Sequence, residues 1–297
     1  MTATSNETAP VPASIPAAMR AAMPATLATL GLVRHMSIEA YHGGAGLSRS
    51  QIEDFLLSPA HFWSRHIDPA RPPAKKATLD QEKGTLLHTL LLEPDTFAQR
   101  YAIGPDVDRR TSEWKTRALE VAPRELIKPE EHRAALGQVA GILADPERRQ
   151  LFARGEPEVS AYWRDEETGL LMRCRPDWVH PAGHNAVILI DAKTCGDASP
   201  AQFARQVARM GYHRQAALYS DGYGKAAGVA VVGFIFVAVE TAWPYAASAC
   251  ILDDAGLDIG RAEVTNAIRG IAACMKENRW PGYEGIEQIE LPRWAAR

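Results

Sequence analysis

A long apolar run, "GVAVVGFIFVAVE" at residues 228–240, constrains most strongly how this chain folds. A strand that faces water on one side alternates apolar and polar residues, whereas a strand covered on both faces is apolar throughout. The run therefore predicts a central strand with other layers packed on both faces. Such a strand, in a chain that also carries helical patterns, indicates an α/β fold.

Helical patterns dominate the first half of the chain. Ser48 and Gln51 have the spacing of a capping box at a helix start, and Pro94 ends a second helix, "QEKGTLLHTLLL". Two more helices are expected at about 112–121 and 129–145. We expect residues 102–112 between them to be irregular and polar.

Strand patterns then appear in "PEVSAYWRD", "LLMRCRPDWVH" and "VILIDAKTC", which alternate and are separated by turn residues. These three segments predict an antiparallel meander. Ser199, Pro200 and Gln202 predict the start of a helix that continues to about Tyr223, with a bend at Gly211. The segment "YAASACIL" predicts a neighbour for the strand at 228–240. A last helix is expected where apolar residues recur at helical spacing: Val264, Ile268, Ile271 and Met275.

The predicted organisation is one folded domain behind a short tail. Residues 1–35 are rich in Ala, Pro and Thr, so we expect a disordered tail rather than a signal peptide. Residues 36–297 are expected to form a single domain, with a helical part at 45–150 and an α/β core at 151–285. No apolar run reaches the ~18 residues of a membrane span, so we expect no membrane partner and a cytoplasmic location.

Charge and cysteine content exclude some classes of protein. The net charge is −3 and the pI is about 6.3, so a nucleic-acid contact would have to come from a local basic patch. The four cysteines are far apart and form no CxxC pair, which argues against zinc and iron–sulfur sites. They are Cys174, Cys195, Cys250 and Cys274.

Two charged residues interrupt the predicted strand "VILIDAKTC". Asp191 and Lys193 are two positions apart, so their side chains share one face of the strand. They could form a structural ion pair. Asp177, in "RPDW" on the preceding predicted strand, suggests a metal site instead, because antiparallel neighbours can bring two carboxylates together. Close carboxylates repel unless a proton or a cation lies between them, and oxygen ligands suit Mg²⁺ or Mn²⁺.

Several motifs, in order along the chain, resemble the PD-(D/E)xK nuclease superfamily. "RPD…DAK" resembles its catalytic motif, and "GTLLHTLLLEP" resembles the histidine-bearing helix of the RecB-like branch. "RQAALYSDGY" is similar to the Q-x-x-x-Y motif of that branch. "LSRSQIEDFLLSPAHFW" and "EVSAYWRDEETGL" resemble the nuclease domain of RecE, exodeoxyribonuclease VIII. The resemblance covers residues 45–285 and implies a restriction-endonuclease-like core, a mixed central sheet flanked by helices.

The resemblance implies a role for each matching residue. His88, Asp177, Asp191 and the carbonyl of Ala192 would bind the metal, and Lys193 would act on the attacking water or the transition state. Gln215 and Tyr219, four apart on one helix face, would support the site and contact the DNA backbone. Glu158 matches a further acid of the family, with Glu82 as a weaker alternative.

The same residues could instead have purely structural roles. His88 could be a core histidine, and Gln215 and Tyr219 ordinary helix residues. Arg173 and Arg175 share a strand face with Asp177 by alternation, so they could pair with carboxylates or contact phosphate. A basic cluster could likewise contact DNA phosphates or be a solvated charge run: Arg109, Arg110, Lys115 and Arg117.

The resemblance implies a Mg²⁺-dependent exonuclease in which Mn²⁺ can replace Mg²⁺. It would digest linear double-stranded DNA from 5′ ends in phage-type recombination, as a homo-oligomeric ring with a single-strand annealing protein as partner. An endonuclease or repair nuclease of the same superfamily is an alternative. A non-catalytic DNA-binding scaffold is another, although such a protein would not need Asp191 and Lys193.

Overall fold

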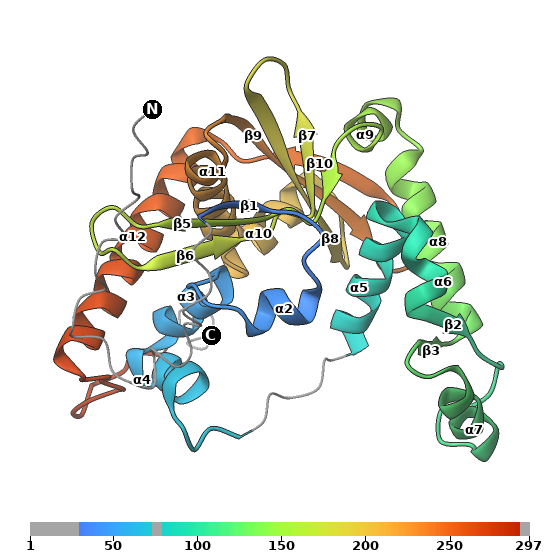
Figure 1. The fold of residues 1–297 in the computed structure, drawn as a ribbon, viewed down its shortest axis with the longest axis horizontal. Helices are drawn as coiled ribbons and strands as arrows, with labels where there is room; N and C mark the ends of the chain where they lie inside the picture. Colours follow the sequence, from blue (N-terminus) through green and yellow to red (C-terminus); the bar gives the residue numbers. More distant parts are fainter. Residues whose placement is uncertain (1–29, 73–78, 292–297) are drawn as a thin grey trace, which may run out of the picture.

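The computed structural model describes residues 30–72 and 79–291. A central mixed sheet of five strands has the order β10-β9-β8-β7-β4 (Figure 1). Its strands are β4 (Glu156–Pro157), β7 (Trp178–Pro181), β8 (Ala186–Cys195), β9 (Ala230–Glu240) and β10 (Ala247–Ile251). β8 and β9 are parallel, and the other neighbours are antiparallel. The predicted mixed central sheet is confirmed.

Helices cover both faces of the central sheet. One side packs against α3 (Arg49–Leu57), α10 (Pro200–Arg209), α11 (Tyr212–Ala227) and α12 (Asp254–Glu277). The other side packs against α5 (Leu79–Leu92), α8 (Pro129–Leu143) and α9 (Pro146–Phe152). β9 is buried from Phe234 to Val239, as its apolar sequence predicts, but its first part is not covered on both faces, because Val232 is 61% exposed. It contributes alternate residues to the two apolar cores.

A second sheet of three strands lies beside α11. Its order is β1-β5-β6, from β1 (Gly31–Val33), β5 (Ser160–Arg164) and β6 (Leu171–Cys174). The hairpin β5–β6 is confirmed, but the expected single meander is wrong. The segment 171–181 divides at Arg175–Asp177, so that β6 joins the small sheet while β7 joins the central one. The predicted tail is also wrong at its end, since β1 pairs with β5; residues 1–29 lie outside the described part.

The remaining elements form the helical part of the domain. They are α2 (Ile38–Gly43), α4 (Pro59–Phe62), η1 (Trp63–Ile67), η2 (Pro94–Thr96), α6 (Phe97–Arg100) and α7 (Ser112–Val121). A parallel pair, β2 (Tyr101–Ile103) and β3 (Glu125–Ile127), was not expected from the sequence. The capping box at the start of α3 is present, with the Ser48 N–H donating to Gln51 Oε1 at 2.8 Å.

The expected helix from Ser199 is two helices rather than one bent helix. Gly211 has a φ of 65°, in the left-handed region, and separates α10 from α11. Ser199 is the N-cap and Pro200 the first residue, but the Ser199 side chain makes no capping hydrogen bond. In the described part of the chain, no helix is both long and apolar enough to cross a bilayer.

Candidate active site

The register of β7 and β8 brings two carboxylates together. Trp178 pairs with Ile190, and β8 then continues past the end of β7. Asp177 lies where β7 begins, and its Oδ2 accepts a hydrogen bond of 2.8 Å from the Ala192 N–H. The unpaired edge of β8 therefore presents backbone groups to the site. Because Ala192 directly follows Asp191, this hydrogen bond places Asp177 next to Asp191, as the sequence predicts.

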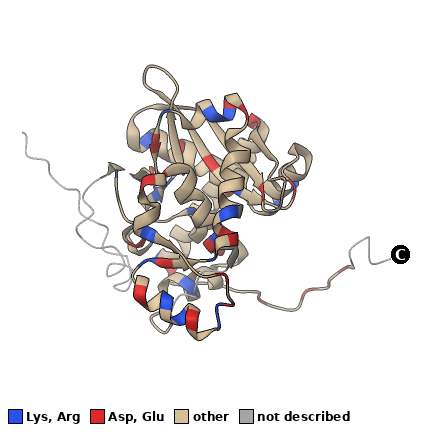
Figure 2. Ribbon diagram, turned by 90° about the vertical axis from the view of Figure 1, so that its right-hand side faces the viewer, with Lys and Arg blue, Asp and Glu red and all other residues tan. Residues whose placement is uncertain are grey.

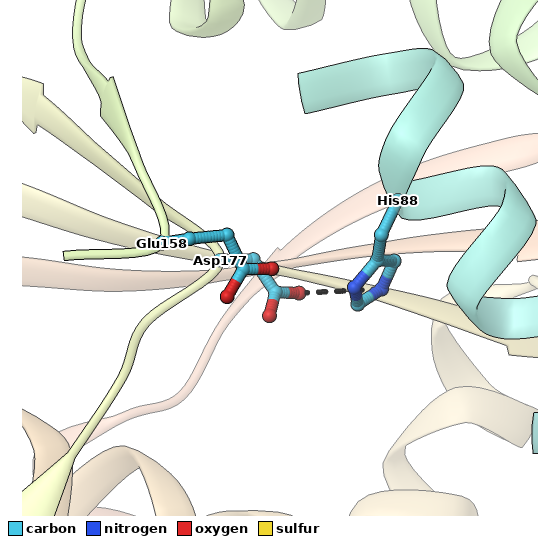
Figure 3. Close-up of side chains that lie close together, drawn as sticks. All are labelled: His88, Glu158 and Asp177. Atoms are coloured by element: carbon cyan, nitrogen blue, oxygen red, sulfur yellow. Dashed lines mark ion pairs between the residues drawn. The ribbon is translucent and has the colours of Figure 1, made fainter. Parts of the chain in front are cut away.

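Three side chains from distant segments converge at this edge (Figure 3). His88 on α5, Glu158 before β5 and Asp177 before β7 each offer a ligand atom within 4.8 Å of the others. His88 Nε2 lies 3.4 Å from Asp177 Oδ2 and 3.1 Å from the Ala192 carbonyl oxygen. Two carboxylates, a carbonyl and one imidazole are a donor set that fits a divalent cation such as Mg²⁺ or Mn²⁺.

Glu158 is held at the site by its backbone. Its φ is 52°, a conformation that is uncommon for a residue with a side chain. The Glu158 N–H donates to the Asp177 carbonyl oxygen at 3.0 Å, which ties the two acidic segments together. The Glu158 carboxylate lies 2.7 Å from Arg175 Nε. Glu82, the alternative acid, instead lies 3.6 Å from Arg109.

Asp191 lies beside this group but has different partners. Its side chain is 1% exposed and contacts Lys193 Nζ and Gln215 Nε2. Lys193 therefore pairs with Asp191, as their spacing predicts, and Gln215 on α11 reaches the same carboxylate. The structure does not include Asp191 among the three clustered ligands, so its role as a metal ligand stays a prediction.

The pKa values of the three clustered side chains are all raised, which reflects close and buried carboxyl groups. Burial and the neighbouring Asp177 raise the pKa of Glu158 to about 7. Burial and the charge of Asp191 also raise the pKa of Asp177. Burial lowers the pKa of His88, but attraction to Asp177 and Glu158 outweighs it, so that the pKa is raised. Carboxyl groups that resist ionisation together are relieved when a cation enters between them.

Arg173 lies against the end of α2 and not at the cluster of His88, Glu158 and Asp177, which corrects the prediction from strand alternation. It is 4% exposed, and its guanidinium donates to the carbonyl oxygens of Tyr41 and Gly44. It therefore supports the end of α2 and is not placed to contact DNA. Arg175 lies outside the strands, so the predicted shared face with Asp177 does not exist. Both guanidinium groups lie over the Tyr41 ring, at 4.8 and 5.5 Å from its centroid.

The distal basic cluster is largely neutralised by acids. Arg109 donates to both Glu131 oxygens at 2.7 Å, while Arg110 is nearly fully exposed and lies 3.4 Å from Asp108. Figure 2 likewise shows basic and acidic residues interspersed along the same helices. DNA contacts by Arg109 and Arg110 stay predictions. A surface hollow of about 550 Å³ lies here, lined by Lys83, Asp108, Arg109, Arg110, Lys128, Glu130, Glu131 and Ala134.

The sequence analysis did not identify two aromatic residues that lie near the site. Tyr41 underlies the two arginines although it lies far from them along the chain. Tyr212 lies beneath Lys193, and only its spacing of three from Gln215 could have suggested a place on the same helix face. Tyr219, expected at the site, packs with its ring edge-to-face against Phe234 in the core. Its contact with DNA stays a prediction.

Comparisons with known proteins agree with this fold. A crystal structure of a candidate exonuclease from Eubacterium rectale is 15% identical, with a TM-score of 0.58 over 83% of this chain and 88% of that one. This similarity shows the fold. A second structure, of SSO0001, is 17% identical and covers 63% of this chain and 85% of that one. Its TM-score of 0.29 is too low to support an argument.

The search of curated proteins found no match. The family model described as "PDDEXK-like domain of unknown function (DUF3799)" matches residues 48–292, which is most of the chain. That span includes the histidine helix, both predicted catalytic strands and the helix that carries Gln215. The chain therefore belongs to this PDDEXK-like family, DUF3799, within the PD-(D/E)xK nuclease superfamily.

Proposed function

We propose that this protein is a divalent-metal-dependent deoxyribonuclease that digests linear double-stranded DNA from 5′ ends. The observation that carries the proposal is the convergence of His88, Glu158 and Asp177 within 4.8 Å, beside Lys193 on β8. A buried ion pair alone would not need a histidine and two further acids at one point. The resemblance to RecE domains in the sequence supports the polarity and the preference for ends.

Each residue has a physical task in this reaction. His88, Glu158, Asp177 and the Ala192 carbonyl would hold Mg²⁺ or Mn²⁺. When bound, the cation supplies Lewis-acid polarisation of the scissile phosphate and lowers the pKa of a water. The Lys193 side chain is 18% exposed, and its ammonium group would meet the negative charge that develops on the phosphate.

Besides the metal-ligand role predicted for Asp191, its carboxylate and the Gln215 amide would position Lys193. The Asp191 carboxylate is buried and contacts the ammonium group, so it limits the positions that the flexible lysine side chain occupies. The Gln215 amide donates to the other Asp191 oxygen and keeps that carboxylate from turning. This arrangement places one cationic group near the candidate metal ligands before DNA binds.

The decisive experiment compares an end-labelled linear duplex with the same DNA as a covalently closed circle. With Mg²⁺ we expect release of nucleotides from 5′-labelled ends and no cutting of the circle, and neither reaction in excess chelator. Lys193→Ala is the matched control, because it should bind the duplex without degrading it. Rapid cutting of the circle would favour the endonuclease alternative, and absence of any metal-dependent cleavage would reject the nuclease.

We also propose that the protein acts as a homo-oligomeric ring around its substrate, with a single-strand annealing protein as partner. The RecE resemblance supports this assembly, and a closed ring with head-to-tail contacts leaves no unpaired subunit surface. Light scattering of the purified protein should give a multiple of the 32.5 kDa chain mass, most simply four. A monomer at all concentrations would contradict the ring.

A further inference from the structure

Tyr212 is the first residue of α11 and lies directly against the proposed catalytic lysine. The Lys193 Nζ is 5.1 Å from the centroid of the Tyr212 ring. Tyr212 is 7% exposed, so the ring cannot turn away into solvent. A cation at this distance from an aromatic face is attracted by the ring quadrupole, and the attraction is stronger where water is excluded.

The Tyr212 ring is itself held in place by its surroundings. It stacks on Phe236 with centroids 5.8 Å apart and an interplanar angle of 27°. Phe236 is the β9 partner of Asp191, so the aromatic stack rests beside the buried carboxylate. Arg49 on α3 places a second cation 5.4 Å from the same ring. The ring therefore has little freedom to follow movements of Lys193.

Tyr212 and Gln215 are three residues apart, on one face of α11. Gln215 donates to Asp191, and Tyr212 contacts Lys193. The two charged side chains of β8, Asp191 and Lys193, therefore each contact a residue of the same turn of α11. The break at Gly211 starts α11 at this point, so that Tyr212 comes to lie over the sheet.

We propose that Tyr212 is a positioning residue for Lys193 in the nuclease reaction. This proposal rests on the proposed function, because positioning has a kinetic meaning only if Lys193 acts on phosphate. Lysine side chains lose considerable rotamer freedom when fixed, and the aromatic wall confines the ammonium group before substrate arrives. The Asp191 carboxylate pairs with the Lys193 ammonium group on one side, and the Tyr212 ring limits its movement on another side.

The kinetic test uses Tyr212→Leu and Tyr212→Phe in steady-state cleavage of a linear duplex. Tyr212→Leu removes the ring, so kcat should fall about 5- to 30-fold while KM and metal affinity stay near wild type. Tyr212→Phe keeps the ring and should retain activity within about twofold of wild type. Equal losses in both variants would instead assign the effect to the hydroxyl group and overturn the proposal.

A double-mutant cycle separates positioning from general packing. In a Lys193→Ala background, Tyr212→Leu should cause no further loss, because the group that it positions is gone. Additive losses would overturn the proposal. Phe203→Leu is the matched control, since Phe203 belongs to the same aromatic cluster, 5.9 Å from Phe236, and contacts no cation in the described residues. Thermal melting should show similar destabilisation for both leucine variants, with kcat reduced only for Tyr212→Leu.

A measurement without DNA tests the contact itself. In protein labelled at lysine Cε, the Lys193 signal, identified by its absence in Lys193→Arg, should be shifted upfield by the ring current of Tyr212. An ordinary lysine shift in the wild type would overturn the proposal even if no leucine variant folds. If the upfield shift is present but no metal-dependent cleavage occurs, the proposed function fails while the contact stands.

Discussion

At the scale of single residues, the two acids of the "RPD…DAK" motif have different partners. Asp177 lies with His88 and Glu158, whereas Asp191 contacts Lys193 and Gln215. The motif therefore divides into a group that offers ligand atoms to a cation and a group that holds a positive charge. Substitutions in the first group should impair metal binding, whereas substitutions in the second should impair turnover.

We expect Asp177→Ala to abolish both cleavage and tight metal binding. Lys193→Ala removes the side chain that carries the ammonium group but none of the clustered ligand atoms, so metal and DNA binding should persist while turnover falls about 100-fold or more. Calorimetric metal titration and single-turnover cleavage measure both effects. Asp191→Ala, titrated alongside, tests whether that carboxylate is also a ligand. Near-wild-type cleavage by folded Lys193→Ala would reduce the Asp191–Lys193 pair to a structural ion pair.

The pH dependence of stability should report on Glu158. Its pKa in the folded protein is raised from 4.5 to about 7, so the folded protein keeps a proton that the unfolded chain releases. Folding then takes up protons, and the free energy of unfolding should fall as pH rises between these values, by a few kcal/mol in order of magnitude. The raised pKa values of Asp177 and His88 act in the same direction.

Urea unfolding of the metal-free wild type and of Glu158→Gln, measured across this pH range, isolates the contribution of Glu158 to the pH dependence of stability. The variant should lose less stability as pH rises, because it cannot ionise at that position. Mg²⁺ should stabilise the wild type more at pH 8 than at pH 5.5, since a cation competes with the protons. Parallel pH curves for the wild type and the variant would show that Glu158 does not have a raised pKa.

At the scale of elements, the break between α10 and α11 decides where the helix side chains point. Gly211 has a φ of 65°, and an added Cβ would meet the Arg214 guanidinium and the Glu53 carboxylate. Gly228, after α11, has a φ of 67° and open space around the same position. The two glycines share a backbone conformation and differ in what surrounds them.

We expect Gly228→Ala to destabilise by about 1 kcal/mol, the cost of a left-handed conformation for a residue with a Cβ. Gly211→Ala should cost more, about 2–3 kcal/mol, because the clash adds to the conformational cost. It should also reduce cleavage, since Tyr212 and Gln215 follow directly. Urea unfolding and single-turnover cleavage of both variants test this. Equal stability losses would show that the neighbours of Gly211 adapt without cost.

At the scale of the whole molecule, a charged contact joins α3, from the first half of the chain, to α11 and α12. Arg214 on α11 donates to Glu53 on α3 at 2.7 and 2.9 Å and to Glu263 on α12 at 2.7 Å. The Arg214 side chain is 18% exposed, so removing it leaves two acids close together in a partly buried place. Because of this contact, we expect the chain to unfold in one cooperative transition and not as two independent domains.

Arg214→Ala should lower the free energy of unfolding by about 2–4 kcal/mol. Arg269→Ala is the matched control, because its pair with Glu167 is more than half exposed, and such pairs contribute about 0–1 kcal/mol. In the wild type, circular dichroism and tryptophan fluorescence should report one urea transition at the same midpoint. Two separate transitions would contradict the prediction of a single domain.

Local patterns in the sequence were sufficient for much of this architecture. The apolar run at 228–240, the capping box at Ser48 and the helix that carries His88 follow from periodicity and capping between near neighbours. The closeness of Asp177 to Asp191 also followed, because two antiparallel strands with a short connection have few possible registers. These features depend on contacts within one element or between adjacent ones.

Only the tertiary structure determined which side chains from different elements contact one another. Periodicity could not show that residues 171–181 form strands of two different sheets, because apolar and polar residues alternate in the same way in a strand of either sheet. Nor could it place Arg173 under α2, Glu158 beside His88, or Gln215 and Tyr212 over Asp191 and Lys193. Those positions depend on packing between segments far apart in the chain, where burial of apolar surface sets the geometry and the polar groups must find partners within it.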